Sequence, residues 1–503
     1  MPHKCIDSLK TIKIIGISLV LTSCSLFYDR RPAGERETLL AQIYSDVALA
    51  ENTIGVNSLE CKRVYQDLYQ RLFDIAGESA YFESSELAGL DSDIKLSFET
   101  RILLKDSFKK FSLNNSLDRE CLDNAQDVFK ALRYVEDYLV ELKMEKMASA
   151  PIEYVNLKGE FPYLLVNPKF SSEFKSYEDL KSGDVILSRG NAYTSAAIAR
   201  ITRSDYQFSH LSFVYKDTKT QELYTTEARI EIGSTANPFS DHLNEKNIRS
   251  AVFRYSQAEV ARKASQKMFD LIKKQQETGK TIEYDFSMNY RDNSKYFCSE
   301  IISHGFKLAD PSLDYLPQFK SQFSKGMIPF LNTLGVPVHS GNIDTLDIFA
   351  PGDIQFDPRF ELVAEWRNPK KLEESRLKDF ILTKLFERMD QHNYRVDPSV
   401  KMDAQSRVFW LLRRTPLVKK FLEKKFALNM SPAQMELFMA LDKIGDAFYK
   451  NLELRSIEYA HPMTPKEIYT AIDDYLNKDY EVYQKYKKDQ ELPKPEFHLL
   501  FHP

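Results

Sequence analysis

Apolar residues recur at three- and four-residue steps over both ends of the chain. In "SLDRECLDNAQDVFKALRYVEDYLVELKM" they occupy positions 122, 125, 129, 132, 135 and 139, which places one apolar stripe along a helix. The pattern predicts helices from Glu35 to about Lys146 and again from about Glu365 onward. Within the second region, Thr464, Pro465 and Glu467 have the order of a helix start with a capping box.

The middle of the chain has a different pattern. Short runs rich in β-branched and aromatic residues are bounded by turn residues, which predicts strands. The strand candidates are "GDVILSRG" (183–190), "HLSFVYKD" (210–217), "ELYTTEARIEIG" (222–233) and "SAVFRYS" (250–256). Helical patterns cover 192–204 and 257–279, and a third begins near Cys298. A sheet with segregated helices predicts the α+β class.

These changes in pattern divide the chain into regions. With 503 residues the chain is too long for one ordinary core. We expect a helical domain at 35–149, a mixed domain at 150–352 and a C-terminal helical region at 353–503. Ten of the 16 glycines lie between Gly159 and Gly352, so the turns are expected mainly in the middle domain.

The N-terminus has the pattern of an export signal. Three lysines precede the apolar run Ile14–Leu21, which is too short to span a bilayer. The following "LTSC" resembles a bacterial lipobox, so we expect a signal peptide at 1–23, an acylated Cys24 and a tether at 24–34. The protein would then be held on a membrane of the cell envelope, on the outer membrane facing the periplasm in a Gram-negative cell. The alternative is an ordinary cleavage site that contains a cysteine.

Charge and motif content argue against several classes of protein. Formal net charge is −4 with acids and bases mixed along the chain, which does not match the clustered basic surface of a nucleic-acid-binding protein. The sequence shows no phosphate-binding glycine loop, no nucleotide fingerprint and no Cys/His metal spacing, so we expect no cofactor and no metal. The lysine-rich "VKKFLEKKF" (418–426) is interpreted as a solvated helix face, with contact to anionic lipid as the alternative.

Cysteine is the first candidate for chemistry. After export, Cys61 and Cys121, both in the N-terminal helical region, could form a disulfide and leave Cys298 unpaired. Cys298 stands in "NSKYFCSEIISHGF" at the expected start of a buried helix, where backbone N–H groups and the helix dipole stabilise a thiolate. The alternative is a small buried apolar residue.

A nucleophilic cysteine requires a base and a group that orients it. His210 opens an apolar strand directly after a polar loop, which makes it the preferred base. His242, in a loop, is the second choice, and His304 is a weaker candidate. Glu227 lies on the next expected strand and would orient His210. Glu231 is its rival, because two-residue alternation would place it on the same strand face.

The segment before Cys298 is rich in aromatic residues. Tyr284, Tyr290 and Tyr296 are candidates for the wall of a substrate groove, with the edge of a core as the equal alternative. Asp184, in the Gly-Asp turn, is interpreted as a structural turn residue.

These motifs together carry a resemblance. The order "GDVILSRGN", "SDYQFSHLSFVY", "TTEAR" and "KYFCSEII" is similar to the permuted NlpC-like papain superfamily, in its YiiX/YaeF/YebB branch, over roughly residues 170–310. The resemblance implies a permuted papain-like fold with Cys298 as nucleophile, His210 as base and Glu227 as orienting group. Two departures are Phe297 directly before the cysteine, where relatives commonly have tyrosine, and Ser212, where they often have glycine.

The sequence thus favours a membrane-anchored thiol hydrolase that cleaves an amide bond. Peptidoglycan stem peptides are the nearest abundant substrate for an exported lipoprotein, and relatives cleave such bonds. Two alternatives stay open. The same three residues could act on a lipid or another acyl ester, as hydrolase or acyltransferase, which an apolar groove would favour. The chain could also be an inactive scaffold whose helical flanks bind a protein partner.

Overall fold

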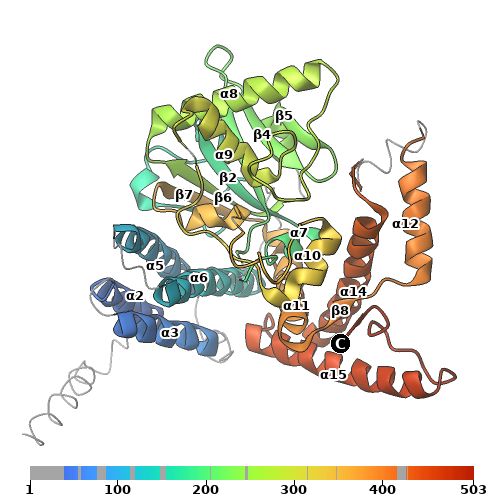
Figure 1. The fold of residues 1–503 in the computed structure, drawn as a ribbon. Coiled ribbons are helices and arrows are strands. Elements are labelled where there is room, and N and C mark those ends of the chain that lie inside the picture. The colour runs from blue at the N-terminus through green and yellow to red at the C-terminus, as the bar shows by residue number, and fades with distance from the viewer. Residues whose placement is uncertain are drawn as a thin grey trace, which may run out of the picture.

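The computed structural model describes most of the chain (Figure 1). The described residues are 39–54, 58–75, 87–113, 119–147, 155–203, 206–243, 247–313, 315–346, 348–415, 426–427 and 429–503. The predicted signal peptide, Cys24 and the tether lie outside them, as does most of the lysine-rich stretch at 418–426.

The N-terminal region is helical. Its described helices are α2 (Leu39–Ala50), α3 (Ser58–Ile75), α5 (Leu87–Leu113) and α6 (Arg119–Lys146). The six apolar positions noted in the α6 sequence are all buried, because α3 and α5 pack against that helix. A disulfide between Cys61 and Cys121 joins α3 to α6, with Cα atoms 5.7 Å apart. Of the described cysteines, Cys298 is the free one.

Seven strands of the described chain form one antiparallel sheet in the order β1-β7-β6-β2-β3-β4-β5. Together with the helices around it, this sheet confirms the α+β class. The strands are β1 (Leu164–Val166), β2 (Asp184–Gly190), β3 (His210–Lys216), β4 (Leu223–Arg229), β5 (Gly233–Pro238), β6 (Asn247–Tyr255) and β7 (Phe360–Arg367).

Two details of the sheet differ from the sequence expectations. The sheet includes β7, which lies beyond the expected domain boundary at residue 352, so the C-terminal helices begin only after Arg367. The run expected as one strand at 222–233 is two strands, because the chain turns between Arg229 and Gly233. Glu231 lies in that turn and does not share a strand with Glu227.

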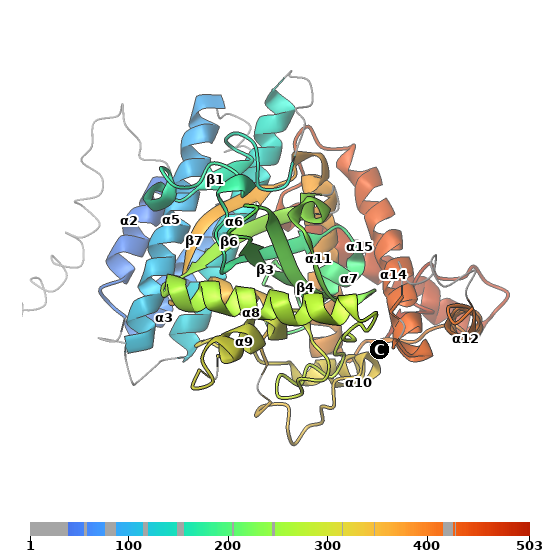
Figure 2. The same ribbon diagram turned by 90° about the horizontal axis from the view of Figure 1, so that it is seen from above.

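Helices α8 (Ala258–Glu277) and α9 (Cys298–Ala309) pack on one face of the sheet. Seen from above, α8 lies across β3 and β4 (Figure 2). Gly305 allows α9 to approach β3 closely, because a Cβ atom at that position would lie 2.9 Å from the ring of Phe213. This close contact sets the position of the helix that begins with Cys298. Before β3, α7 (Tyr193–Ile198) is shorter than the helix expected at 192–204.

The opposite face of the sheet has a core of its own. Ile186, Val214, Val252 and Trp366 pack there against residues of the segment that precedes β2. Because both faces are covered, β2 is buried almost throughout. Short 3₁₀ turns lie at Pro168–Phe170, Tyr177–Asp179, Phe239–Leu243, Lys325–Met327, Pro351–Gln355 and Pro369–Lys371.

Helices dominate the C-terminal region, beside the sheet domain in Figure 1. They are α11 (Leu372–His392), α12 (Val400–Leu412), α14 (Pro432–Ser456) and α15 (Pro465–Lys488), and a two-stranded sheet pairs β8 (Arg395–Val396) with β9 (Phe501–His502). Helix α10 (Ile328–Leu334) precedes β7 in the chain and packs against α14. The Thr464 hydroxyl and Glu467 form the predicted capping box at α15. Within the described part of the chain, no helix combines the length and apolar character needed to cross a bilayer.

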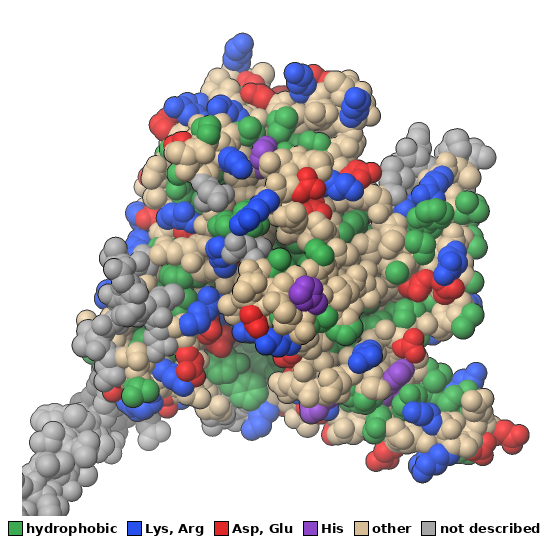
Figure 3. All heavy atoms as spheres, viewed as in Figure 1, with side chains coloured by type: hydrophobic (Ala, Val, Ile, Leu, Met, Phe, Trp, Pro, Cys, Tyr) green, Lys and Arg blue, Asp and Glu red, His purple; other side chains and the backbone are tan. Residues whose placement is uncertain are grey.

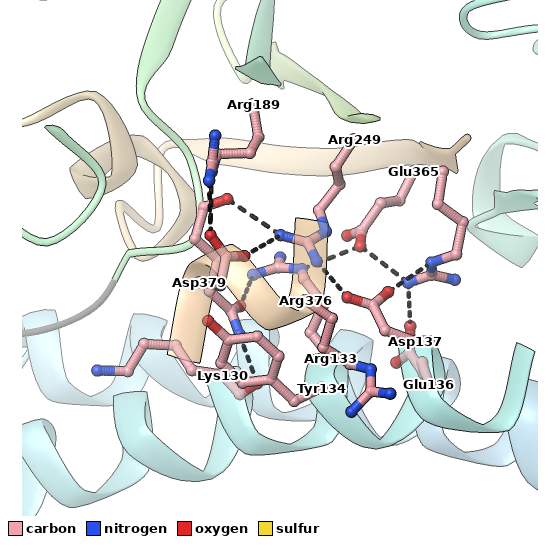
Figure 4. A network of polar contacts seen from close by, with 12 residues as sticks. Lys130, Arg133, Tyr134, Glu136, Asp137, Arg189, Arg249, Glu365, Arg376 and Asp379 are labelled. Atoms are coloured by element: carbon pink, nitrogen blue, oxygen red, sulfur yellow. Dashed lines mark hydrogen bonds and ion pairs between the residues drawn. The ribbon is translucent and has the colours of Figure 1, made fainter. Parts of the chain in front are cut away.

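A buried network of charged residues connects the three regions (Figure 4). Arg133 of α6 donates to Glu365 of β7 at 2.9 Å, and Arg189 of β2 donates to Asp379 of α11 at 2.8 Å. The network also includes Arg101, Glu136, Asp137, Arg200, Arg249 and Arg367. Removing one partner would leave an uncompensated buried charge, which is costly. The network therefore holds the N-terminal and the C-terminal helices against the sheet. It lies close to the residues that directly follow Arg189.

Candidate active site

Cys298 is the first residue of α9, and its side chain is buried. The Glu300 carboxylate accepts a hydrogen bond of 2.6 Å from the backbone N–H of Phe297, which fixes the chain directly before the cysteine. The Cys298 sulfur lies 4.0 Å from the Ser209 carbonyl oxygen, at the start of β3. The sulfur thus occupies the position at a helix N-terminus where backbone dipoles favour negative charge.

His210 is the first residue of β3, and its ring is held by β4. Its Nε2 atom lies 2.6 Å from a carboxylate oxygen of Glu227, and the Ser212 hydroxyl donates to the same oxygen at 3.0 Å. The strand register explains this contact: Phe213 pairs with Thr226, so Glu227 lies opposite Ser212 and diagonal to His210. Diagonal neighbours are within reach of long side chains.

The ring of His210 also interacts with Cys298. Because Nε2 is bound to Glu227, Nδ1 is the nitrogen available for the hydrogen bond between His210 and Cys298. Burial lowers the pKa of His210, but its hydrogen bonds and charge interactions with Cys298 and Glu227 outweigh burial and raise the pKa to about 10. Burial alone would raise the pKa of Glu227, but His210 lowers it well below its usual range. The structure therefore brings these three side chains together, with His210 interacting with both Glu227 and Cys298.

A cleft of about 290 Å³ opens beside His210 and Glu227. His210, Glu227, Tyr284 and His242 are in its wall. Residues from Gly190, at the end of β2, to Ser195, in α7, form another side. Glu231 and Asp241 add two carboxylates. The Cys298 side chain is only 1% exposed, so a substrate in the cleft reaches the sulfur only after lining side chains move.

Beside the cleft lies a small apolar pocket of about 10 Å³, which we call the apolar annex, lined by Ile198, Ile230, Phe286, Phe330, Leu334 and Phe438. Tyr284 lines both spaces. Two of the annex residues come from α10 and one from α14, so the C-terminal region contributes to the surroundings of the site. The Asn429 side chain donates a hydrogen bond of 2.8 Å to the Tyr284 carbonyl, which ties the chain before α14 to the cleft wall.

The other predicted site residues lie in different places. His242 lines the cleft, its pKa is lowered by burial, and its Nε2 atom has no hydrogen-bond partner among the described residues. His304 lies along α9 against the ring of Tyr296, 5.3 Å between centroids. Tyr296 is buried and does not line the cleft, and neither does Tyr290, whose hydroxyl accepts from Arg291 at 3.1 Å.

Two functional features were missed by sequence reasoning. Ser212 was noted only as a departure from glycine, yet its hydroxyl helps to hold Glu227. Ser195 of α7 and Ser209 share a hydrogen bond of 2.5 Å, and the Ser195 hydroxyl also accepts from the Gly190 N–H at 2.9 Å. The serines near His210 in "FSHLS" were the sequence signal that could have pointed to these hydrogen bonds. Asp184 forms an ion pair with Arg254, as expected of a structural turn residue.

Residues 179–325 match a family described as permuted papain-like amidase enzymes, YaeF/YiiX, family C92. A crystal structure described as the metalloprotein YiiX from Escherichia coli O157:H7 is similar over 37% of this chain and 98% of that chain, with 19% identity and a TM-score of 0.28. No curated protein matches the chain. Among the described residues of this chain, no group of three or more His, Cys, Asp and Glu side chains could hold a metal ion.

Proposed function

We propose that Cys298, His210 and Glu227 form a catalytic triad that cleaves an amide bond, on the premise that residues 179–325 match the permuted papain-like amidases of the YaeF/YiiX type. The observation that carries the proposal is the position of His210, whose Nε2 atom lies 2.6 Å from Glu227 and whose ring interacts with the Cys298 side chain at the start of α9.

The reaction needs only these groups and water. His210 takes the proton from the Cys298 sulfur, and the thiolate attacks the amide carbonyl carbon. The C–N bond then breaks, and His210 gives its proton to the departing amine. His210 next takes a proton from water, whose oxygen attacks the thioester carbon. The C–S bond breaks, the acid is released, and the sulfur and imidazole return to their first state.

The surroundings of the sulfur support this sequence of steps. The raised pKa of His210 favours an imidazolium, which stabilises the thiolate next to it. The first N–H groups of a helix have no acceptor within that helix, so those of Cys298 and Ser299 are available to the oxyanion of the tetrahedral intermediate. Glu227 keeps the imidazole in one orientation through both proton transfers.

For the substrate we propose a peptide amide in peptidoglycan stem peptides, cleaved by a protein anchored to the cell envelope through Cys24. Glu231 and Asp241 line the cleft together with one cation, Arg229. The excess of carboxylate supports a substrate that carries a free amino group near the scissile bond. Stem peptides carry such groups.

A second substrate class is favoured by the apolar annex. The annex holds only about 10 Å³, so the side chains of Ile198, Phe286 and Phe438 would have to move apart for the hydrocarbon chain of an acyl ester or an acylated amine to pack among them. The carbonyl carbon would then face Cys298. The same residues would then form an acyl-enzyme, and water or a second acceptor would release the acyl group.

The proposal is tested with a panel of stem-peptide amides and acyl esters. Cys298→Ala and His210→Gln are expected to abolish the hydrolysis that the wild type shows. His304→Gln is the matched control, because His304 is on α9 and outside the cleft. Full activity in Cys298→Ala would refute the proposal. A preference for amides with free amino groups identifies the first substrate class, and a preference for long acyl chains identifies the second.

A further inference from the structure

Helix α12 carries an apolar surface that faces away from the protein. Its inner side packs on α14, where Met402 and Ser406 are buried and the Ser406 hydroxyl donates to Glu436 at 2.8 Å. On the outer side, Val400 is 86% exposed, Leu411 62% and Val408 51%. A helix that is apolar on both sides is normally covered on both, so this exposed surface requires an explanation.

The helix stands at the edge of the molecule. In Figure 1 it projects beside α14 as an arm away from the sheet domain, and Figure 3 shows hydrophobic side chains gathered on this arm with Lys and Arg side chains beside them. We call the exposed residues Val400, Val408, Leu411 and Leu412 the arm surface. They are spaced at three- to four-residue steps or multiples of them, so they share one side of the helix.

Cations flank the arm surface. Lys401, Arg407 and Arg414 are exposed. The acid of α12 is Asp403, which is half-buried and bonded to Arg407 at 2.7 Å. The Arg414 guanidinium lies over the Trp410 ring, 3.4 Å from its centroid. Apolar side chains, a tryptophan and basic residues on one helix are the combination that binds at the interface of an anionic bilayer.

We propose that α12 is a membrane-surface helix, with the arm surface inserted among the acyl chains of an anionic lipid layer and its cations on the headgroups. The binding differs from an acyl anchor, because it depends on the charge of the lipid and weakens as salt screens that charge. It would orient the protein on the membrane, where a tether alone leaves the orientation free.

Tryptophan fluorescence tests this helix specifically. The chain has two tryptophans: Trp366 is in the sheet core, 1% exposed, and Trp410 is on α12. The full chain with Cys24→Ser, which removes any acyl chain, is mixed with phosphatidylcholine vesicles with or without phosphatidylglycerol. Trp410 is half-buried against the core, on a different side of α12 from the arm surface, so its emission wavelength is not the readout. We expect quenching of the Trp410 emission by brominated acyl chains on the anionic vesicles, because insertion of the arm surface brings the whole helix to the acyl chains. The quenching should fall when salt is raised.

The double variant Val408→Asp/Leu411→Asp should bind anionic vesicles at least about tenfold more weakly, because two apolar side chains no longer enter the acyl layer and two negative charges face the anionic headgroups. Leu454→Asp/Ile457→Asp is the matched control, since these two apolar residues are also exposed but lie at the other end of α14. All four substitutions are at exposed positions, and unchanged circular dichroism checks that each variant folds. The proposal is overturned by an absence of Trp410 quenching on anionic vesicles, by equal response to neutral vesicles, by equal binding of the two double variants, or by a dimer that forms through the arm surface.

Discussion

Replacing Glu227 with glutamine keeps the shape of the side chain and removes the charge that faces His210. In the wild type the pKa of His210 is raised from 6.5 to about 10, a difference that corresponds to roughly 5 kcal/mol between the two protonation states. Cys298 and Glu227 share this effect, and a hydrogen bond to a charged group contributes about 1.5–3 kcal/mol. We therefore expect Glu227→Gln to lower the free energy of unfolding by about 2 kcal/mol at pH 6 and to lower the pKa of His210.

The pH dependence follows from the directions of the two pKa changes. The pKa of His210 is raised on folding, so its stabilisation is complete below about pH 6.5 and is lost as the pH rises toward 10. The pKa of Glu227 is lowered, so its stabilisation is present above its usual value of 4.5 and is lost in acid. The difference between wild type and Glu227→Gln should therefore be largest between about pH 4.5 and 6.5 and smaller at pH 10.

Urea unfolding at pH 6 and pH 10 measures this difference in stability. NMR titration of labelled histidines measures the pKa of His210 directly. The His210 signal is assigned by its loss in His210→Gln. Glu231→Gln is the matched control: this acid lines the same cleft and is not bonded to His210. The reasoning is refuted if the His210 signal of the wild type titrates near 6.5, or if both variants lose equal stability at each pH.

Gly305→Ala should lower the free energy of unfolding by about 1–3 kcal/mol, because the new methyl group meets the ring of Phe213 in β3. Gly89→Ala in α5 has open space around the new methyl group and should raise the free energy of unfolding by about 0.5–1 kcal/mol. Urea unfolding compares the two variants. Reducing the disulfide between α3 and α6, which closes a separation of 60 residues, should cost the N-terminal helices about 4 kcal/mol, measured by their denaturation midpoint with and without reductant. Asn429→Ala removes the hydrogen bond to the cleft wall, so alkylation of Cys298 should become about fivefold faster, as measured by mass spectrometry; an equal rate would exclude a covering role for that bond.

Local patterns were sufficient to predict the elements that carry the site. The run "GDVILSRG" has consecutive apolar residues bounded by glycines and forms the buried strand β2, and the segment around Cys298 forms a helix that begins at the cysteine itself. The contact of His210 with Glu227 was also within reach of the sequence. Two successive strands joined by a short turn pair with each other, and the pairing brings their polar residues together.

The strand β7 was missed because its sequence, "FELVAEWR", contains charged residues that normally lie in solvent. Glu365 and Arg367 are instead fully buried, and their partners come from α5 and α6, more than 200 positions earlier. No local pattern contains such a partner. The same reason explains the surroundings of the site, because Asn429 bonds to the cleft wall and Phe438 lines the apolar annex, and both come from the C-terminal region. Tyr290 and Tyr296 were placed in the groove by proximity in sequence alone.

The most direct test of the catalytic proposal is the rate at which iodoacetamide modifies Cys298 at neutral pH, followed by peptide mapping in the wild type, His210→Gln and His304→Gln. If His210 activates the sulfur, the wild type and His304→Gln should react at similar rates, and His210→Gln at least about tenfold more slowly. A Cys298 that is not modified in the wild type, or that reacts equally fast without His210, would contradict the account.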